Sequence, residues 1–259
     1  MANAGNGRLK GRTALITGGS KGLGFAMARS LGSAGASVVL VARTVADLDR
    51  ASGTLTDEGI SARAIPCDVA DPGAVDHLVR AMDDQPVDVL INNAGESRDL
   101  PFEQATDTDW QTDLDQKLMA AVRLCRAFMP GMRERRWGRV INVLNVGAKA
   151  PAAGSMPTSV TRAAGMALTK ALSKEYAPHN VLVNAINIGL IESDQWRRRH
   201  HGVCRSRSPG SCYGVSRRDR LGGSWRWRLP DDQPGTGHHR PGEDQEHQDC
   251  HYQQRPYRG

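Results

Sequence analysis

The feature that most constrains the fold is a regular alternation of short apolar runs with helical patterns through the first two hundred residues. Runs rich in Val, Ile and Leu predict six buried strands, over 13–17, 37–42, 62–69, 87–95, 138–145 and 181–186. Apolar residues at helical spacing predict helices between them, including a long helix that ends at Pro130 and another over 158–176. This order predicts an α/β fold: a Rossmann-type, doubly wound parallel sheet in three layers (α/β/α), with right-handed crossovers. Ligands of such sheets bind beyond the carboxyl ends of the strands.

A glycine-rich segment, TGGSKGLG over 17–24, lies between the first predicted strand and the first predicted helix. Gly18 permits a tight turn, Gly22 lets the backbone approach a pyrophosphate, and Gly24 permits close packing of the helix. The free N–H groups at the start of the helix favour phosphate. The alternative is a glycine-rich turn without a ligand, but its place between strand and helix favours a dinucleotide site.

The end of the second strand indicates which dinucleotide is bound. An acidic residue there would accept a hydrogen bond from the adenosine ribose and favour NAD(H). The chain instead has Arg43, and Lys21 lies in the glycine-rich turn. These two cations predict a site for a 2′-phosphate, and therefore NADP(H) in preference to NAD(H). The alternative is that both are solvated surface cations.

Residues 200–259 break the alternating pattern. Their only aliphatic residues with branched side chains are Val203, Val215, Leu221 and Leu229, whereas Arg and Gly are abundant. Such a segment buries too little apolar surface to offset the entropy of ordering it. We therefore expect an NAD(P)-binding Rossmann domain over 1–199 and an irregular or disordered tail over 200–259, with the last strand and helix of the fold missing. The change in composition also fits a gene read out of frame, a hypothesis that an intact-mass measurement of native protein tests.

Charge and cysteine content restrict the location and partners of the protein. The formal charge of +6 is too small to indicate nucleic acid, and no apolar run is long enough to cross a membrane. Five Cys without tight pairing, and an N-terminus without an apolar signal region, favour the cytoplasm. The His and Cys residues of the tail lack metal-ligand spacing, so no metal site is expected, and binding of single-stranded nucleic acid through Trp225 to Arg228 is a minor alternative.

Several motifs occur in order and together resemble the short-chain dehydrogenase/reductase family over residues 8–196. They are the glycine-rich turn, Asp68 with Val69 after the third strand, and NNAG over 92–95 after the fourth. The resemblance implies hydride transfer between a nicotinamide and a carbonyl or alcohol substrate, and a homo-oligomer, either a dimer or a tetramer. It assigns the following residues to the cofactor: Thr17, Gly18, Ser20, Lys21, Gly22, Leu23, Gly24, Arg43, Asp68, Val69, Asn92, Ala94, Gly95, Gly189 and Ser193.

The catalytic positions of the family are all substituted. The family uses Asn, Ser, Tyr and Lys, with Tyr as the acid/base. This chain has Lys117, Asn145, Thr158 and Arg162 at those four places. A Thr hydroxyl does not titrate near neutral pH, and Arg stays protonated.

Of the four, Lys117 is the one whose pKa burial could bring into a useful range, so we take it as the candidate proton donor. The alternative for Lys117 is a plain cation on the surface of a helix. The sequence thus favours an NADP(H)-dependent oxidoreductase. The alternatives are a nucleotide-binding pseudoenzyme and the inactive product of a damaged gene.

Overall fold

The structure is a computed structural model that describes residues 7–82 and 85–189. Its centre is a sheet of six parallel strands in the order β3-β2-β1-β4-β6-β8. The strands are β1 (Thr13–Thr17), β2 (Ser37–Ala42), β3 (Ala62–Pro66), β4 (Val89–Asn92), β6 (Gly138–Asn145) and β8 (Val181–Ile188). The chain winds outward from β1 to β3 and then returns to β4 on the other side of β1, so the carboxyl ends of β1 and β4 form the switch point at which such sheets bind ligands.

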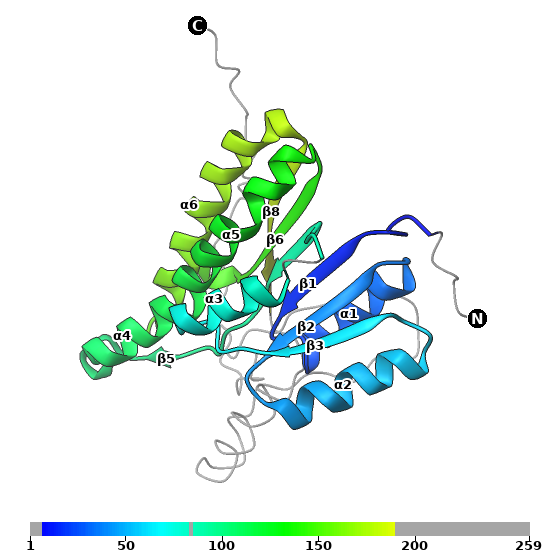
Figure 1. The fold of residues 1–259 in the computed structure, drawn as a ribbon. Coiled ribbons are helices and arrows are strands. Elements are labelled where there is room, and N and C mark those ends of the chain that lie inside the picture. Colours follow the sequence, from blue (N-terminus) through cyan, green and yellow to red (C-terminus); the bar gives the residue numbers. More distant parts are fainter. Residues whose placement is uncertain (1–6, 83–84, 190–259) are drawn as a thin grey trace, which may run out of the picture. The chain divides into compact units, whose positions relative to one another are not determined.

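Helices cover both faces of the sheet (Figure 1). On one face lie α1 (Gly22–Ser33) and α2 (Val45–Asp57). On the other lie α3 (Pro72–Ala81), α5 (Ala120–Glu134) and α6 (Thr158–Tyr176). The expected Rossmann-type fold in three layers is confirmed. The expected loss of its last strand and helix, and the irregular tail over 200–259, concern residues outside the described ranges.

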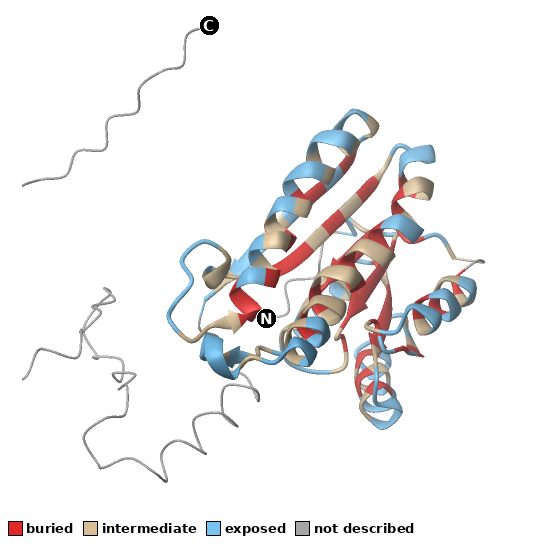
Figure 2. Ribbon diagram, turned by 90° about the vertical axis from the view of Figure 1, so that its left-hand side faces the viewer, coloured by how far each residue is buried: buried red, intermediate tan, exposed pale blue. Residues whose placement is uncertain are grey.

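Each face of the sheet has its own apolar core, and the central strands β1, β2 and β4 are largely buried between the two helical layers (Figure 2). Leu15, Leu90 and Val140 point toward the α3, α5 and α6 layer, whereas Ile16 and Ile91 point toward α1 and α2. This alternation explains why the strands read as continuous apolar runs, since both of their faces are covered.

The connections carry short elements that the sequence pattern did not predict. After β4 come β5 (Asp99–Leu100) and a 3₁₀ turn (Phe102–Gln104), followed by α4 (Asp107–Asp113) and a π-helical segment (Leu114–Met119) that runs into α5. After β6 come a 3₁₀ turn (Val146–Ala148) and β7 (Met156–Pro157), which pairs with β5 in antiparallel fashion. A last 3₁₀ turn (Ala177–His179) precedes β8. The β5–β7 pair ties the connection after β4 to the start of α6.

Four elements differ from their expected bounds. β8 continues to Ile188 instead of ending at Ile186. β3 lies at the edge of the sheet and ends at Pro66 instead of continuing to Val69; proline cannot donate to a neighbouring strand, so Pro66 itself indicated a strand that stops there or lies near an edge. β4 is shorter than the expected 87–95. The prediction that Pro130 ends the long helix is wrong: α5 continues to Glu134, since Met132 in its last turn is fully buried beside Gly138.

Candidate active site

The glycine-rich turn has the geometry that its sequence predicts. Gly18 and Gly22 have φ of +64° and +53°, in the left-handed region that favours glycine. A Cβ added to Gly24 would lie 2.1 Å from the carbonyl oxygen of Gly18, so a larger residue does not fit between the turn and α1. A Cβ added to Gly22 would meet no atom within 4 Å. The backbone at Gly22 is therefore open at the start of α1.

Thr17 organises this turn from the interior instead of facing a ligand. Its hydroxyl donates to the carbonyl of Ile91 (3.2 Å) and accepts from the N–H groups of Asn93 (2.9 Å) and Ala94 (3.0 Å). The Asn93 amide in turn donates to the Thr17 carbonyl (2.9 Å). These bonds hold the loop after β4 against the glycine-rich turn.

Both cations predicted to bind a 2′-phosphate are partly exposed and are paired with carboxylates. Lys21 Nζ lies 2.7 Å from Asp47, and Arg43 lies 3.3 Å from Glu96. The hydrogen bond from Lys21 lowers the pKa of Asp47. Arg43 and Glu96 belong to the loops after β2 and β4, so this ion pair extends across the end of β1, where the glycine-rich turn begins.

The remaining cofactor candidates differ in how far their side chains are exposed to solvent. The Asp68 carboxylate is at the surface and accepts from the N–H of Ala70 (3.0 Å), whereas Val69 is buried. The Asn92 side chain is also buried and donates to Asn142 (2.8 Å), so it faces the interior. Ser20, Leu23, Ala94 and Gly95 are partly accessible, and Gly189 is exposed after β8. Ser193 lies outside the described residues.

A second group of polar residues lies beyond the same loop. The ammonium of Lys117 forms an ion pair with Asp113 and donates to the hydroxyl of Thr158 (2.9 Å). The hydroxyl of Thr161 donates to the other oxygen of Asp113. The side chains of Lys117 and Asp113 are each only 1% exposed. The alternative of Lys117 as a surface cation is therefore wrong.

All hydrogen-bonding directions of the Thr158 hydroxyl are occupied by protein. It accepts from the Arg98 N–H (2.7 Å) and from Lys117, and it donates to the Arg98 carbonyl (3.0 Å) or to Asp113 (3.3 Å). A hydroxyl has one proton and two lone pairs, so this set saturates it. Thr158 therefore anchors the loop after β4 and the Lys117 ammonium, and it has no proton left for a substrate.

Removing this hydroxyl should weaken the fold more than the chemistry. We expect Thr158→Val to reduce the free energy of unfolding by about 1–3 kcal/mol, because it leaves the buried backbone groups of Arg98 without partners. Thr158→Ser should retain these bonds and most of the stability. Denaturant unfolding of both variants measures the difference; equal stability of Thr158→Val and the parent would contradict this role.

Arg162 and Asn145 complete the group. Arg162 donates to the carbonyl of Val143 (2.7 Å), and a Cβ added to Gly95 would lie 2.9 Å from its Nη2 atom and 3.2 Å from Cγ of Lys117. The lack of a side chain at Gly95 thus lets both cations pack against the loop after β4. The Oδ1 atom of Asn145 is buried and finds no hydrogen-bond partner among residues 7–82 and 85–189. A buried amide in that state suits a polar ligand.

The electrostatics of the group favour a titratable lysine. Burial lowers the pKa of Lys117 to about 8, the ion pair with Asp113 opposes this shift, and the nearby Arg162 adds to it. Burial also lowers the pKa of Arg162. A group whose pKa lies near the working pH is suited to general acid–base catalysis.

Sequence reasoning missed Asp113, Thr161 and the contribution of the Arg98 backbone. The pattern of Leu114 and Leu118 predicted that these leucines, and not Asp113 and Lys117, form the buried face of the helix. In the structure both leucines are only partly buried. One available signal was the spacing of Asp113 and Lys117, since residues at i and i+4 are neighbours on a helix. The π-helical segment that carries Lys117 is a second indication, because such segments are frequent at functional sites.

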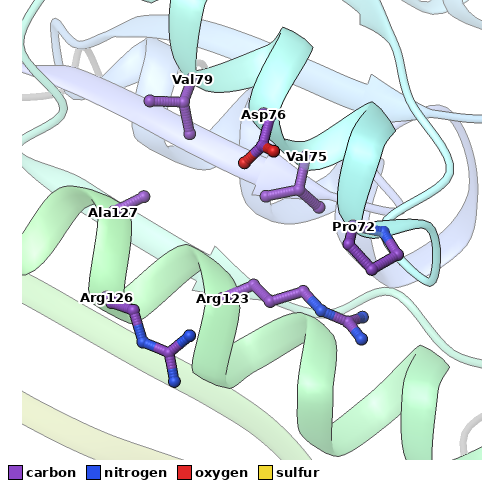
Figure 3. Close-up of a pocket in the computed structure, with 7 residues that line it drawn as sticks. All are labelled: Pro72, Val75, Asp76, Val79, Arg123, Arg126 and Ala127. Atoms are coloured by element: carbon purple, nitrogen blue, oxygen red, sulfur yellow. The ribbon is translucent and has the colours of Figure 1, made fainter.

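A groove between α3 and α5 lies apart from these groups (Figure 3). It is lined by Pro72, Val75, Asp76, Val79, Arg123, Arg126 and Ala127. Arg123 is held there by the carbonyl of Ala70 (3.0 Å) and by Asp115 (3.0 Å). None of the cofactor or catalytic candidates lines the groove, so we assign it no part in the reaction.

A doubly wound parallel sheet with a glycine-rich turn at its switch point defines the class of Rossmann-type dinucleotide-binding proteins. The family model of the short chain dehydrogenases matches residues 12–202. The chain belongs to this family of oxidoreductases, which confirms the resemblance found in the sequence.

Individual relatives agree with this assignment. An uncharacterized oxidoreductase of Mycobacterium bovis is 36% identical over 73% of this chain, and the chain spans 57% of that protein's length. The crystal structure of L-sorbose reductase from Gluconobacter frateurii, complexed with NADPH and L-sorbose, has a TM-score of 0.74 and 36% identity, over 76% of each chain. The NADPH-bound structure of a short chain oxidoreductase from Pseudomonas aeruginosa PAO1, described as containing an atypical catalytic center, has a TM-score of 0.70 and 35% identity, over 74% of this chain and 76% of that one.

Proposed function

We propose that the protein is an NADP(H)-dependent oxidoreductase that transfers hydride between the nicotinamide and the carbon of a small carbonyl or alcohol substrate. One observation carries this proposal. The loop after β4 is bonded on one side to Thr17 of the glycine-rich turn and is contacted on the other by Lys117 and Arg162. A dinucleotide seated on the turn would therefore have its reactive end toward a buried group that can hold a proton.

The chain supplies binding, orientation and a proton, while NADPH supplies the hydride when it is bound. The backbone N–H groups at Gly22 and the start of α1 would hold the pyrophosphate. Lys21 and Arg43 would bind the 2′-phosphate, Arg43 by releasing Glu96 from an exposed ion pair of little stability. Arg162 would donate to ribose hydroxyls, and Asn145 would bind the substrate oxygen. NADPH or NADP in related structures supports the choice of cofactor.

Arg43 should control the choice between the two dinucleotides. We expect Arg43→Gln to weaken NADPH binding by about 10- to 100-fold, the loss of one hydrogen bond between charged groups, and to leave NADH binding unchanged. The matched control is Arg50→Gln, because Arg50 is also exposed and also pairs with a carboxylate of this region, Asp47. Titration calorimetry with both dinucleotides measures the effect. Equal losses of affinity for NADPH and NADH would show that Arg43 does not bind the 2′-phosphate.

Activity is tested by incubating the purified chain with NADPH and a panel of ketones, sugars and quinones, and by following absorbance at the nicotinamide band. Oxidation of NADPH above background supports the proposal. The substituted family positions favour one competing function, a nucleotide-binding protein without turnover. That function predicts a rise in melting temperature with NADPH and no oxidation with any substrate.

The proposal also covers the location and the assembly of the protein. The structure holds no helix, within its described residues, that is long and apolar enough to cross a membrane. Cys67 and Cys125 are buried free thiols, and burial raises the pKa of both. The thiols support a reducing compartment such as the cytoplasm. The family resemblance supports a homo-oligomer, whose mass light scattering of the purified chain measures.

A further inference from the structure

We propose that Asp113 is the positioning residue of the proton donor: it holds the Lys117 ammonium so that one N–H remains for the substrate oxygen. This inference rests on the proposed function. It assigns a role to a residue that has no counterpart among the four catalytic positions of the family resemblance.

The contacts define the direction of the ammonium. Within residues 7–82 and 85–189, its acceptors are Asp113 and Thr158, which leaves one of its three hydrogens for a ligand. Asp113 is itself fixed, because its second oxygen accepts from Thr161 in the first turn of α6. The pair thus connects the end of α4 to the start of α6, and each side chain is only 1% exposed.

The charges that face Lys117 come from three elements. Asp113 on α4 and Asp99 on β5 favour the protonated amine, whereas Arg162 on α6 and burial oppose it. Asp113 is the carboxylate in direct contact. Without it, the two buried cations Lys117 and Arg162, packed against Gly95, would lose the carboxylate that most offsets their charge, and the lysine would lose its proton at a lower pH.

The proton step balances as follows. In the direction of reduction, bound NADPH would supply the hydride for the carbonyl carbon and become NADP, and the carbonyl oxygen would take a proton from Lys117. The N–H bond breaks and leaves its electron pair on nitrogen, and an O–H bond forms on the product alcohol. The neutral amine remains hydrogen-bonded to Thr158, and it takes a proton from water after the alcohol has left.

The test compares Asp113→Asn with the matched control Asp115→Asn, in which the same change two residues away removes the partner of Arg123. Lysine labelled with ¹³C at Cε reports the ionisation of Lys117 directly by NMR, and its signal is assigned from Lys117→Met. In Asp113→Asn we expect the titration midpoint of Lys117 and the fall of kcat at high pH to move together, by about one to three pH units downward. At pH 8, where about half of Lys117 is protonated in the parent, this corresponds to a loss of about five- to 500-fold in kcat. In Asp115→Asn both should match the parent.

A second variant keeps the test decisive if Asp113→Asn does not fold. Asp113→Glu retains the charge but displaces the carboxylate by one methylene, so we expect a lower kcat, an unchanged KM and a Lys117 midpoint close to that of the parent. An Asp113→Asn titration that superimposes on the parent curve, or an Asp113→Glu variant with full kcat, would overturn the proposal. If the parent oxidises no NADPH, the proposed function fails, while the NMR titration still decides whether Asp113 sets the charge of Lys117.

Discussion

Lys117→Met is expected to lower kcat for carbonyl reduction by about 100- to 10,000-fold, the range of a lost general acid, and to leave NADPH binding unchanged. Methionine fills a similar volume, but it leaves the buried Asp113 carboxylate without its ion-pair partner, so the stability of the variant is measured beside its rate. Thr158 cannot substitute for the lysine, because its one proton is donated to the Arg98 carbonyl or to Asp113. Steady-state rates with saturating NADPH, and calorimetry for its affinity, separate the two effects.

The same lysine should determine the pH dependence of the parent. Reduction needs the protonated amine, so kcat should be constant below about pH 8, the pKa of Lys117, and should fall above it. Oxidation of the alcohol needs the neutral amine and should rise over the same range. Lys170→Met, which changes an exposed lysine of α6, is the control. A Lys117→Met variant with the rate and pH profile of the parent would show that the proton has another source.

The fold was largely predictable because both faces of the central strands are covered. A strand buried on two sides has to be apolar throughout, so β1, β2 and β6 were predicted to the residue. The two-residue strands β5 and β7 are too short to show a pattern, and they pair only because the chain brings the loops after β4 and β6 together. Tertiary packing also explains why α5 continues past Pro130, since Met132 beyond the proline is fully buried.

The candidate site was predictable where backbone conformation dictates residue type. Gly18 and Gly22 have a positive φ, and Gly24 leaves no room for a Cβ atom. The spacing of the three glycines was enough to predict these requirements. The partner of Lys117 could not be found in the same way. A buried ion pair places charged residues where the hydrophobic pattern expects apolar ones. Around Asp113 the pattern assigned the buried face to Leu114 and Leu118, which lie one residue further along the helix than Asp113 and Lys117. Thr161, which also contacts Asp113, lies on α6, 45 or more residues further along the chain.

The second large effect is expected from Gly24→Ala. The added Cβ would lie 2.1 Å from the Gly18 carbonyl oxygen and 2.7 Å from the Asn93 amide, so the turn has to move away from α1. Overpacking of this kind costs about 1–3 kcal/mol, and here it also displaces the N–H groups that would hold a pyrophosphate. We therefore expect a melting temperature lower by about 2–12 °C, at about 2–4 °C for each kcal/mol, and no saturable NADPH binding.

Gly22→Ala separates the two parts of that effect. Its Cβ meets no protein atom within 4 Å, so the cost to the fold is the strain of a positive φ, about 1–2 kcal/mol. The same methyl group occupies the open side of the turn, and NADPH affinity should fall by about tenfold or more, the loss of one charge-assisted hydrogen bond. Gly53→Ala, at an exposed position of α2 with open space around it, should bind NADPH like the parent and unfold at a slightly higher temperature. If Gly22→Ala bound NADPH with the parent's affinity, the pyrophosphate could not lie over this turn, since the methyl group and the phosphate oxygens would compete for one space.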